Sequence, residues 1–121
     1  MIIHNVFFAL NDNSAAARRA LIDGCWKYLS VHPGILHFWV GELAADHVRS
    51  VNDRDWDVGL HVVYQDKAAH DLYHGHPLHD QFVAEFASNW KTSRVFDSVA
   101  SLRGHDLPPA AEHSVAKETA Q

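Results

Sequence analysis

Alternation of apolar and polar residues predicts four β-strands in this chain. They cover residues 2–10, 35–42, 56–64 and 91–99, and branched or aromatic side chains dominate the first three. The first strand is mostly apolar on both faces, so both faces should be covered by other parts of the protein. One of those faces carries Ile2, His4, Val6, Phe8 and Leu10.

A helix is predicted between the first and second strands. Asn13 or Ser14 can cap its start, and the helix should end before the His32-Pro33-Gly34 sequence. The segment 44–55, after the second strand, is polar and has no clean period, so a loop is expected there. The apolar stripe of the helix consists of Ala17, Leu21, Gly24, Cys25 and Tyr28.

A kinked pair of helical segments is predicted between the third and fourth strands, in the region from Ala69 to Phe86. Asp66 can cap the first segment. A proline disfavours helical geometry in the residue before it but fits the first position of a helix, so the second segment should begin at Pro77. The side chains expected to face inward are those of Ala69, Leu72, Tyr73, His79, Val83, Phe86 and Trp90, bordered by Leu78 and Phe82.

The order β-α-β-β-α-β predicts an α+β, ferredoxin-like domain over residues 1–100, with an antiparallel sheet and the helices on one face. Residues 101–121 are expected to form a loosely held tail. The helices leave one sheet face open, and a second copy is its natural cover, which predicts a homodimer in the form of a dimeric α/β barrel. The apolar residues assigned to that face are Ile3, Phe7, Phe38, Val40 and Val63.

Charge and composition narrow the class of protein. The 121 residues carry a formal net charge of −5 with neutral histidines, and this lack of a basic surface argues against nucleic-acid binding. No apolar run approaches the roughly 18 residues of a membrane span. The absence of a recognisable signal peptide and the single cysteine, Cys25, lead us to expect a protein of the reducing cytoplasm.

The histidine-rich stretch between the third and fourth strands is the main candidate site. Tyr73 and His79 are both predicted to point inward. A histidine can take a proton next to a carbonyl group while a tyrosine hydroxyl stabilises the enolate oxygen that forms. Asp97 or His4 could orient that histidine. The alternative is that His79 bonds to the backbone at a helix start and Tyr73 fills core space.

A metal site is the second candidate in the same stretch. His70 and His74 lie four residues apart, the spacing at which two imidazoles on one helix can reach one ion, and His76 lies close by. The chain has no H-E-x-x-H motif, and no cysteine lies near these histidines. A solvated edge carrying several histidines is therefore the favoured interpretation, and we expect neither a metal nor an organic cofactor.

Four segments together resemble the stress-responsive A/B barrel family, known as Dabb. They are MIIHNVFFAL at the start, HPGILHFWVGE, WDVGLHVVYQDKAAHDLYHGHPLHDQF and the late RVFDS. The resemblance spans roughly residues 1 to 99. It implies a ferredoxin-like monomer that pairs through its sheet into a dimeric α+β barrel.

The resemblance also implies roles for individual residues. The family includes a plant olivetolic acid cyclase, which closes a linear polyketide by an aldol condensation without a metal or organic cofactor. By similarity to its D-x-Y-x-x-H-P-x-H motif, His79 would act as the base and Tyr73 would assist. The substrate-binding residues expected on this basis, together with the inward stripe of the helices, are His4, His76, Asp97, Phe82 and Phe86.

Three functions remain open from the sequence. The first is a Dabb protein that binds a small hydrophobic molecule in a pocket between sheet and helices. The second is a cofactor-independent enzyme, polyketide-cyclase-like or monooxygenase-like, that uses His79 and Tyr73. The third is a non-catalytic dimeric interaction protein. A hydrophobic cavity containing Tyr73 and His79 would favour the first two.

Overall fold

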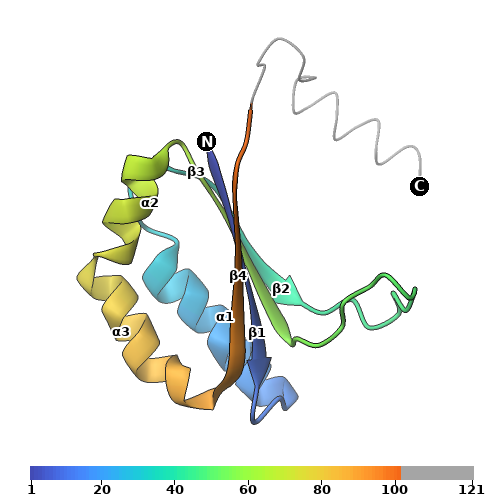
Figure 1. The fold of residues 1–121 in the computed structure, drawn as a ribbon. Coiled ribbons are helices and arrows are strands. Elements are labelled where there is room, and N and C mark those ends of the chain that lie inside the picture. Colours follow the sequence, from blue (N-terminus) through green and yellow to red (C-terminus); the bar gives the residue numbers. More distant parts are fainter. Residues whose placement is uncertain (102–121) are drawn as a thin grey trace, which may run out of the picture.

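Four strands form one antiparallel sheet with the order β2-β3-β1-β4 in this computed structural model, which describes residues 1–101. The predicted tail lies outside the described residues from position 102 onward. Figure 1 shows all the helices on one side of the sheet, so the α+β, ferredoxin-like fold is confirmed. The elements are β1 (Ile2–Leu10), α1 (Ala15–Leu29), β2 (Ile35–Glu42), β3 (Val58–Tyr64), α2 (Lys67–His74), α3 (Pro77–Phe86), a 3-10 turn (Ala87–Asn89) and β4 (Trp90–Val99).

Side chains cap the helices at the predicted places. The Ser14 hydroxyl accepts a hydrogen bond from the backbone N–H of Ala17 (3.2 Å), and the Asp66 carboxylate accepts one from the N–H of Ala69 (2.9 Å). Helix α3 begins at Pro77, as predicted, and His76 caps it by accepting a bond from the N–H of Leu78 (3.1 Å). The kink between α2 and α3 is therefore a new helix start with its own cap.

The core lies between the sheet and the helices. Antiparallel register pairs residues that share a face, so the core side of β1 continues into the core sides of β3 and β4. Helix α1 contributes the predicted stripe from Leu21 to Tyr28. The buried cluster consists of Val6, Phe8, Leu10, Leu21, Cys25, Tyr28, Leu29, Val58, Leu60, Val62, Tyr64, Ala69, Tyr73 and Phe82.

The predicted faces of Phe38 and Val40 on β2 are wrong. Phe38 and Val40 pair with Val62 and Leu60 and pack against the core, whereas the sequence pattern placed them on the open face. The register of β2 shifts between Ile35 and His37, and this irregularity brings Ile35 and Phe38 to the same side of the sheet. An alternation pattern alone does not reveal such a shift.

The third strand begins at Val58, two residues later than predicted. The N–H of Asp57 donates to the carbonyl of Phe8 (2.7 Å), and its carboxylate accepts a bond from the N–H of Leu10 (2.8 Å), so Asp57 ties the preceding loop to β1. The Trp56 ring packs on Phe7, with 4.9 Å between centroids, on the face opposite the helices. Trp56 therefore lies outside β3, and its ring is on the side of the sheet opposite to the core residue Val58.

Two predicted inward residues of the kinked helices are exposed. Leu72 is 69% exposed, and Val83 is also exposed, while Phe82 occupies the buried position of α3. Leu72 lies within α2 and Val83 within α3, so the predicted inward face was misplaced within each helix rather than across the kink. Among residues 1–101, no helix is long and apolar enough to cross a membrane.

The turn at Gly34 fixes the distance between α2 and the start of β2. Gly34 has a φ of 86°, in the region that favours glycine. A Cβ atom added there would lie 2.5 Å from the Cβ of Ala69, which precedes His70 on α2. Only glycine allows this close approach without displacing α2.

We therefore expect Gly34→Ala to lower the free energy of unfolding by about 2–4 kcal/mol, the sum of backbone strain and overpacking. Gly75→Ala is the matched control, since Gly75 has a φ of −91° and its added Cβ meets nothing closer than 3.7 Å. Urea denaturation of the two variants measures the difference. Equal stability losses would contradict this account of the turn.

Candidate functional site

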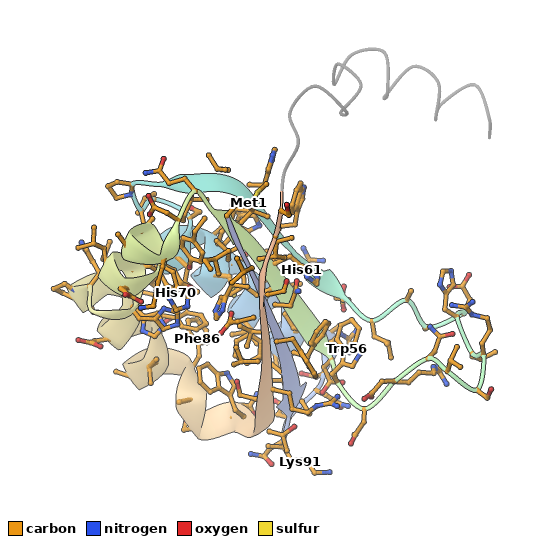
Figure 2. The ribbon with its side chains drawn as sticks, turned by 45° about the horizontal axis from the view of Figure 1, so that its top comes forward. Met1, Trp56, His61, His70, Phe86 and Lys91 are labelled. Atoms are coloured by element: carbon orange, nitrogen blue, oxygen red, sulfur yellow. The ribbon has the colours of Figure 1, made fainter. Side chains whose placement is uncertain are left out.

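A cavity of about 250 Å³ lies between the sheet and helices α2 and α3. Figure 2 shows the His70 side chain on the helix side of the sheet, while His61 and Trp56 lie on the other side. The apolar walls come from Val6, Phe8, Leu29, Leu60, Phe82, Val83, Trp90 and Val95, and the polar lining from His4, His70, Tyr73, His74, His79, Ser93 and Asp97. The cavity thus joins an apolar wall to a dense group of imidazoles.

A histidine–carboxylate pair, with His4 buried and Asp97 partly exposed to solvent, anchors the polar part of the cavity. His4 and Asp97 are direct cross-strand partners on β1 and β4, so their side chains leave the sheet on the same face. The Nδ1 of His4 donates to the Asp97 carboxylate at 2.5 Å. His4 is only 3% exposed. Because its Nδ1 bonds to Asp97, its Nε2 is the ring nitrogen that stays available to another group. The sequence prediction left the orienting partner of His79 open between these two residues, whereas in the structure Asp97 orients His4.

Helix α2 directs two histidines toward His4. The His70 and His74 rings lie 5.3 and 5.1 Å from the His4 ring, centroid to centroid, and 4.2 Å from each other. Both side chains line the cavity, where His70 is half-buried and His74 remains exposed, so the edge that the sequence predicted to be solvated is also part of the cavity wall.

Tyr73 and His79 meet across the kink. Their ring centroids are 5.1 Å apart, and the His79 ring also lies 4.9 Å from that of His74. Tyr73 is almost completely buried, and within the described residues no side chain or backbone group hydrogen-bonds to the His79 ring. The predicted pair is thus brought together at the cavity wall.

Burial favours the neutral forms of His4, His74, His79 and Tyr73. Desolvation lowers the pKa of His4 below its ordinary value, and the hydrogen bond to Asp97 opposes this effect in part. Desolvation also lowers the pKa of His74 and of His79, and the neighbouring His74 adds to the effect at His79. Burial raises the pKa of the Tyr73 hydroxyl. The site therefore offers neutral imidazoles as proton acceptors beside a protonated tyrosine.

Five of the seven sequence-predicted site residues line one cavity: His4, Tyr73, His79, Phe82 and Asp97. His76 and Phe86 do not. His76 instead caps α3, the backbone role that had been the alternative for His79, and its ring faces that of His32 at 4.7 Å. The Phe86 ring lies over Gly24, where an added Cβ would come within 2.2 Å of it, and so joins α3 to α1.

The fold and the site define a class of small ferredoxin-like α+β proteins with a polar-ended cavity under the helices. Residues 2–100 match the model of the Stress Responsive A/B Barrel Domain, Dabb. The chain therefore belongs to the Dabb family, as its motifs predicted. Among proteins with curated descriptions, none matches the sequence significantly.

Several solved structures share the fold. A Dabb-family protein from Mesorhizobium loti is 24% identical, with 84% of this chain and 97% of that chain covered and a TM-score of 0.69. A dimeric ferredoxin-like protein of unknown function from Thermobifida fusca is 17% identical, with 82% and 90% covered and a TM-score of 0.68. A hydroxynitrile lyase from Passiflora edulis is 16% identical, with 84% and 94% covered and a TM-score of 0.67.

The lowered histidine pKa values make stability depend on pH. His79 faces His74, Asp80, His32 and His4, and its folded pKa lies below the unfolded value of about 6.5. Above the unfolded pKa both states are neutral; as pH falls through it toward the folded pKa, the unfolded chain binds more protons. We therefore expect the midpoint of thermal unfolding to drop between about pH 8 and about pH 5.

Replacing His79 with glutamine removes one of the histidines that make stability depend on pH. The midpoint of thermal unfolding should therefore drop less at low pH in His79→Gln than in the parent chain. His47→Gln, a change in the exposed loop, should leave the dependence of the unfolding midpoint on pH as in the parent chain. Differential scanning calorimetry across this range tests both variants. A midpoint that does not change with pH would mean that these imidazoles are solvated in the folded state.

Proposed function

We propose that this protein binds a small, largely apolar molecule in the cavity and transfers a proton to or from it with His79 and Tyr73. The observation that carries this proposal is the meeting of an apolar wall, which includes Phe8 and Phe82, with the Tyr73–His79 pair in one cavity. Ligand sites in proteins combine mostly apolar linings with a few placed polar groups in this way. The proposed step needs only side chains of this chain.

The size of the cavity limits the ligand. A cavity of about 150 Å³ is enough to hold benzene, and the cavity here measures about 250 Å³. A substituted single ring or a short branched chain fits that volume. The proposed substrate class is therefore a small aromatic or branched carbonyl compound.

The chemistry of the pair fits removal of a proton next to a carbonyl group. A neutral imidazole is the form of histidine that accepts a proton, and burial favours this form at His79. The hydroxyl of Tyr73 stays protonated because burial raises its pKa, so it is able to donate a hydrogen bond to an enolate oxygen. The proton moves from the substrate carbon to His79, and the negative charge develops on the oxygen beside Tyr73.

Exchange of α-protons in acetophenone, dissolved in D₂O and followed by proton NMR, tests this step with a ligand of suitable size. We expect the protein to accelerate the exchange and His79→Ala to lower the rate by at least about 10²-fold. Tyr73→Phe should lower it by about 10²-fold while the dissociation constant rises less than about 10-fold, since one hydrogen bond is lost.

His47→Ala is the control for a general loss of histidine and should exchange at the parent rate. Binding of acetophenone without exchange would support a ligand-binding protein and contradict the enzymatic step. Absence of binding, checked by titration calorimetry over a panel of small aromatic ketones, would contradict both parts of the proposal.

We further propose that the chain is a homodimer formed through the sheet face that the helices leave open. Trp39 and Phe96 are each 54% exposed on that face, and the Phe7 ring contacts those of Phe96 and Trp56 at 5.9 and 4.9 Å. A contiguous aromatic surface is unusual on a monomer in water. The structural relative from Thermobifida fusca is described as dimeric.

Sedimentation velocity at micromolar concentration tests the dimer. The parent chain should sediment as a dimer, and Phe96→Asp should convert it to a monomer, because a charge would be buried without a partner. Val51→Asp is the matched control, since Val51 is 79% exposed in the loop and lies off the sheet. A monomeric parent chain, or a dimeric Phe96→Asp variant, would contradict this arrangement.

We also propose a reducing compartment such as the cytoplasm. The sole cysteine, Cys25, is fully buried in the core, and burial raises the pKa of its thiol to about 12. Such a thiol is inert and packs as a small apolar group, so the chain uses no disulfide chemistry of its own.

A further inference from the structure

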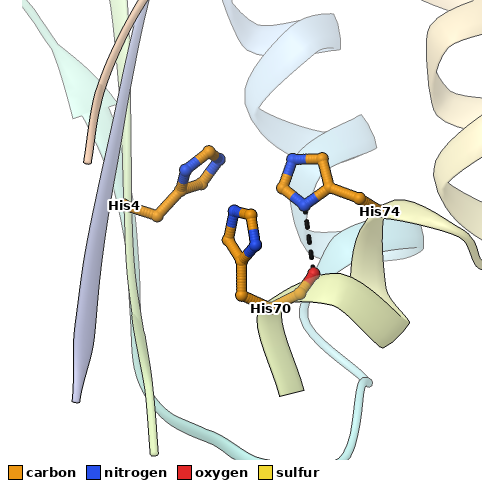
Figure 3. Close-up of side chains that lie close together, drawn as sticks. All are labelled: His4, His70 and His74. Atoms are coloured by element: carbon orange, nitrogen blue, oxygen red, sulfur yellow. Dashed lines mark hydrogen bonds between the residues drawn. The ribbon is translucent and has the colours of Figure 1, made fainter. Parts of the chain in front are cut away.

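Three histidine side chains from two elements converge at one end of the cavity. His4 projects from the core face of β1, and His70 and His74 project from one face of α2 (Figure 3). One ring nitrogen from each lies within 4.8 Å of the other two. In a tetrahedral zinc site with Zn–N bonds of about 2.0–2.1 Å, two ligating nitrogens are about 3.4 Å apart. The ring nitrogens lie within a wider limit than this value, so binding of the ion requires the rings to move closer together.

Each of the three rings is held through its Nδ1 atom by an oxygen. His4 bonds to the Asp97 carboxylate at 2.5 Å, His70 to the Asp71 carboxylate at 3.2 Å, and His74 to the backbone carbonyl of His70 at 3.1 Å. Carboxylates and carbonyls accept hydrogen bonds, so the proton lies on Nδ1 and the lone pair on Nε2. Metal-binding histidines are held in this way by partners that fix the tautomer and ring orientation.

The same arrangement is unfavourable without a cation. With every Nδ1 bonded to an oxygen, the Nε2 atom of each ring is left as an acceptor, and none of the three rings offers a donor to the others. The carboxylates of Asp97 and Asp71 add negative charge behind two of the rings. The neighbouring Tyr64 hydroxyl is also buried without a hydrogen-bond partner among residues 1–101. A divalent ion and its water would satisfy these groups together.

We propose that His4, His70 and His74 bind one zinc ion per chain, with the fourth coordination position open toward the cavity. Three imidazoles and one exchangeable water are a common ligand set for zinc, which prefers nitrogen ligands and tetrahedral geometry. Asp97 and Asp71 are positioning residues that hold two of the ligands. This site goes beyond the proton transfer proposed above and does not depend on it, since zinc binding needs only the three imidazoles.

Calorimetric titration of the full-length, chelator-treated protein with Zn²⁺ tests the site directly. We expect one ion per chain, and a loss of affinity of at least about 10²-fold in His70→Ala and in His74→Ala. Both residues lie on the helix surface facing the cavity, so these variants should fold even if a change at the buried His4 does not. Asp97→Asn should weaken binding by about 10–100-fold, the effect typical of removing a partner that orients a ligand.

Cobalt substitution gives a second readout, because Co²⁺ bound to three imidazoles and water in tetrahedral geometry absorbs visible light more strongly than aqueous octahedral Co²⁺. His47→Ala, in the exposed loop, and His79→Ala, in the cavity outside the histidine triad, should both retain the parent affinity and spectrum. His79→Ala therefore separates the two proposals, since it should abolish proton exchange and keep zinc.

Failure to bind Zn²⁺, or equal affinity in the parent chain and in His70→Ala or His74→Ala, would overturn the assignment. A comparable loss of affinity in His47→Ala would also overturn it, because binding would then be spread over a histidine-rich surface. Loss of Zn²⁺ binding in His79→Ala would contradict the identity of the three ligands.

Discussion

The register between β1 and β4 is the constraint on which the candidate site depends. It places His4 directly opposite Asp97 on the face that the helices cover, and a hydrogen bond of 2.5 Å joins the two side chains. Side chains alternate between the faces of a sheet, so a shift of one residue would move either partner to the open face. The pair thus fixes the position of one imidazole, and the helices bring the other polar groups to it.

The kink between α2 and α3 supplies those groups. A single straight helix would present its inward residues along one stripe, whereas the new start at Pro77 changes the direction of the chain after one short helix. His70, Tyr73 and His74 come from the end of the first helix, and His79 comes from the first turn of the second. Three of these side chains lie against the His4 ring, and His79 joins the group through Tyr73 and His74. The close approach at Gly34 keeps α2 near the sheet, which links the stability of a distant turn to the geometry of the site.

Much of this arrangement was predictable from the sequence because it follows local rules. Proline at the first helical position, the caps at Ser14 and Asp66, and the element order led to the correct fold, and the alternation in the first strand placed His4 on the core side. The face of Phe38 and the position of Trp56 were not predictable, because a register shift in β2 and the hydrogen bonds of Asp57 set them. The pairing of His4 with Asp97 and the convergence of His70 and His74 on that pair are tertiary contacts across 66 to 93 positions, and no local pattern encodes them.

The central claim is that Asp97 holds His4 as a neutral imidazole whose Nε2 faces the cavity. Long-range ¹⁵N–¹H correlation spectra of the metal-free protein at about pH 7.5 report the tautomer of each histidine ring directly. The account predicts that His4 carries its proton on Nδ1 and that Asp97→Asn changes this signal, while the signal of His47 stays as it is. A His4 ring protonated on Nε2 alone, or on both nitrogens at this pH, would contradict it.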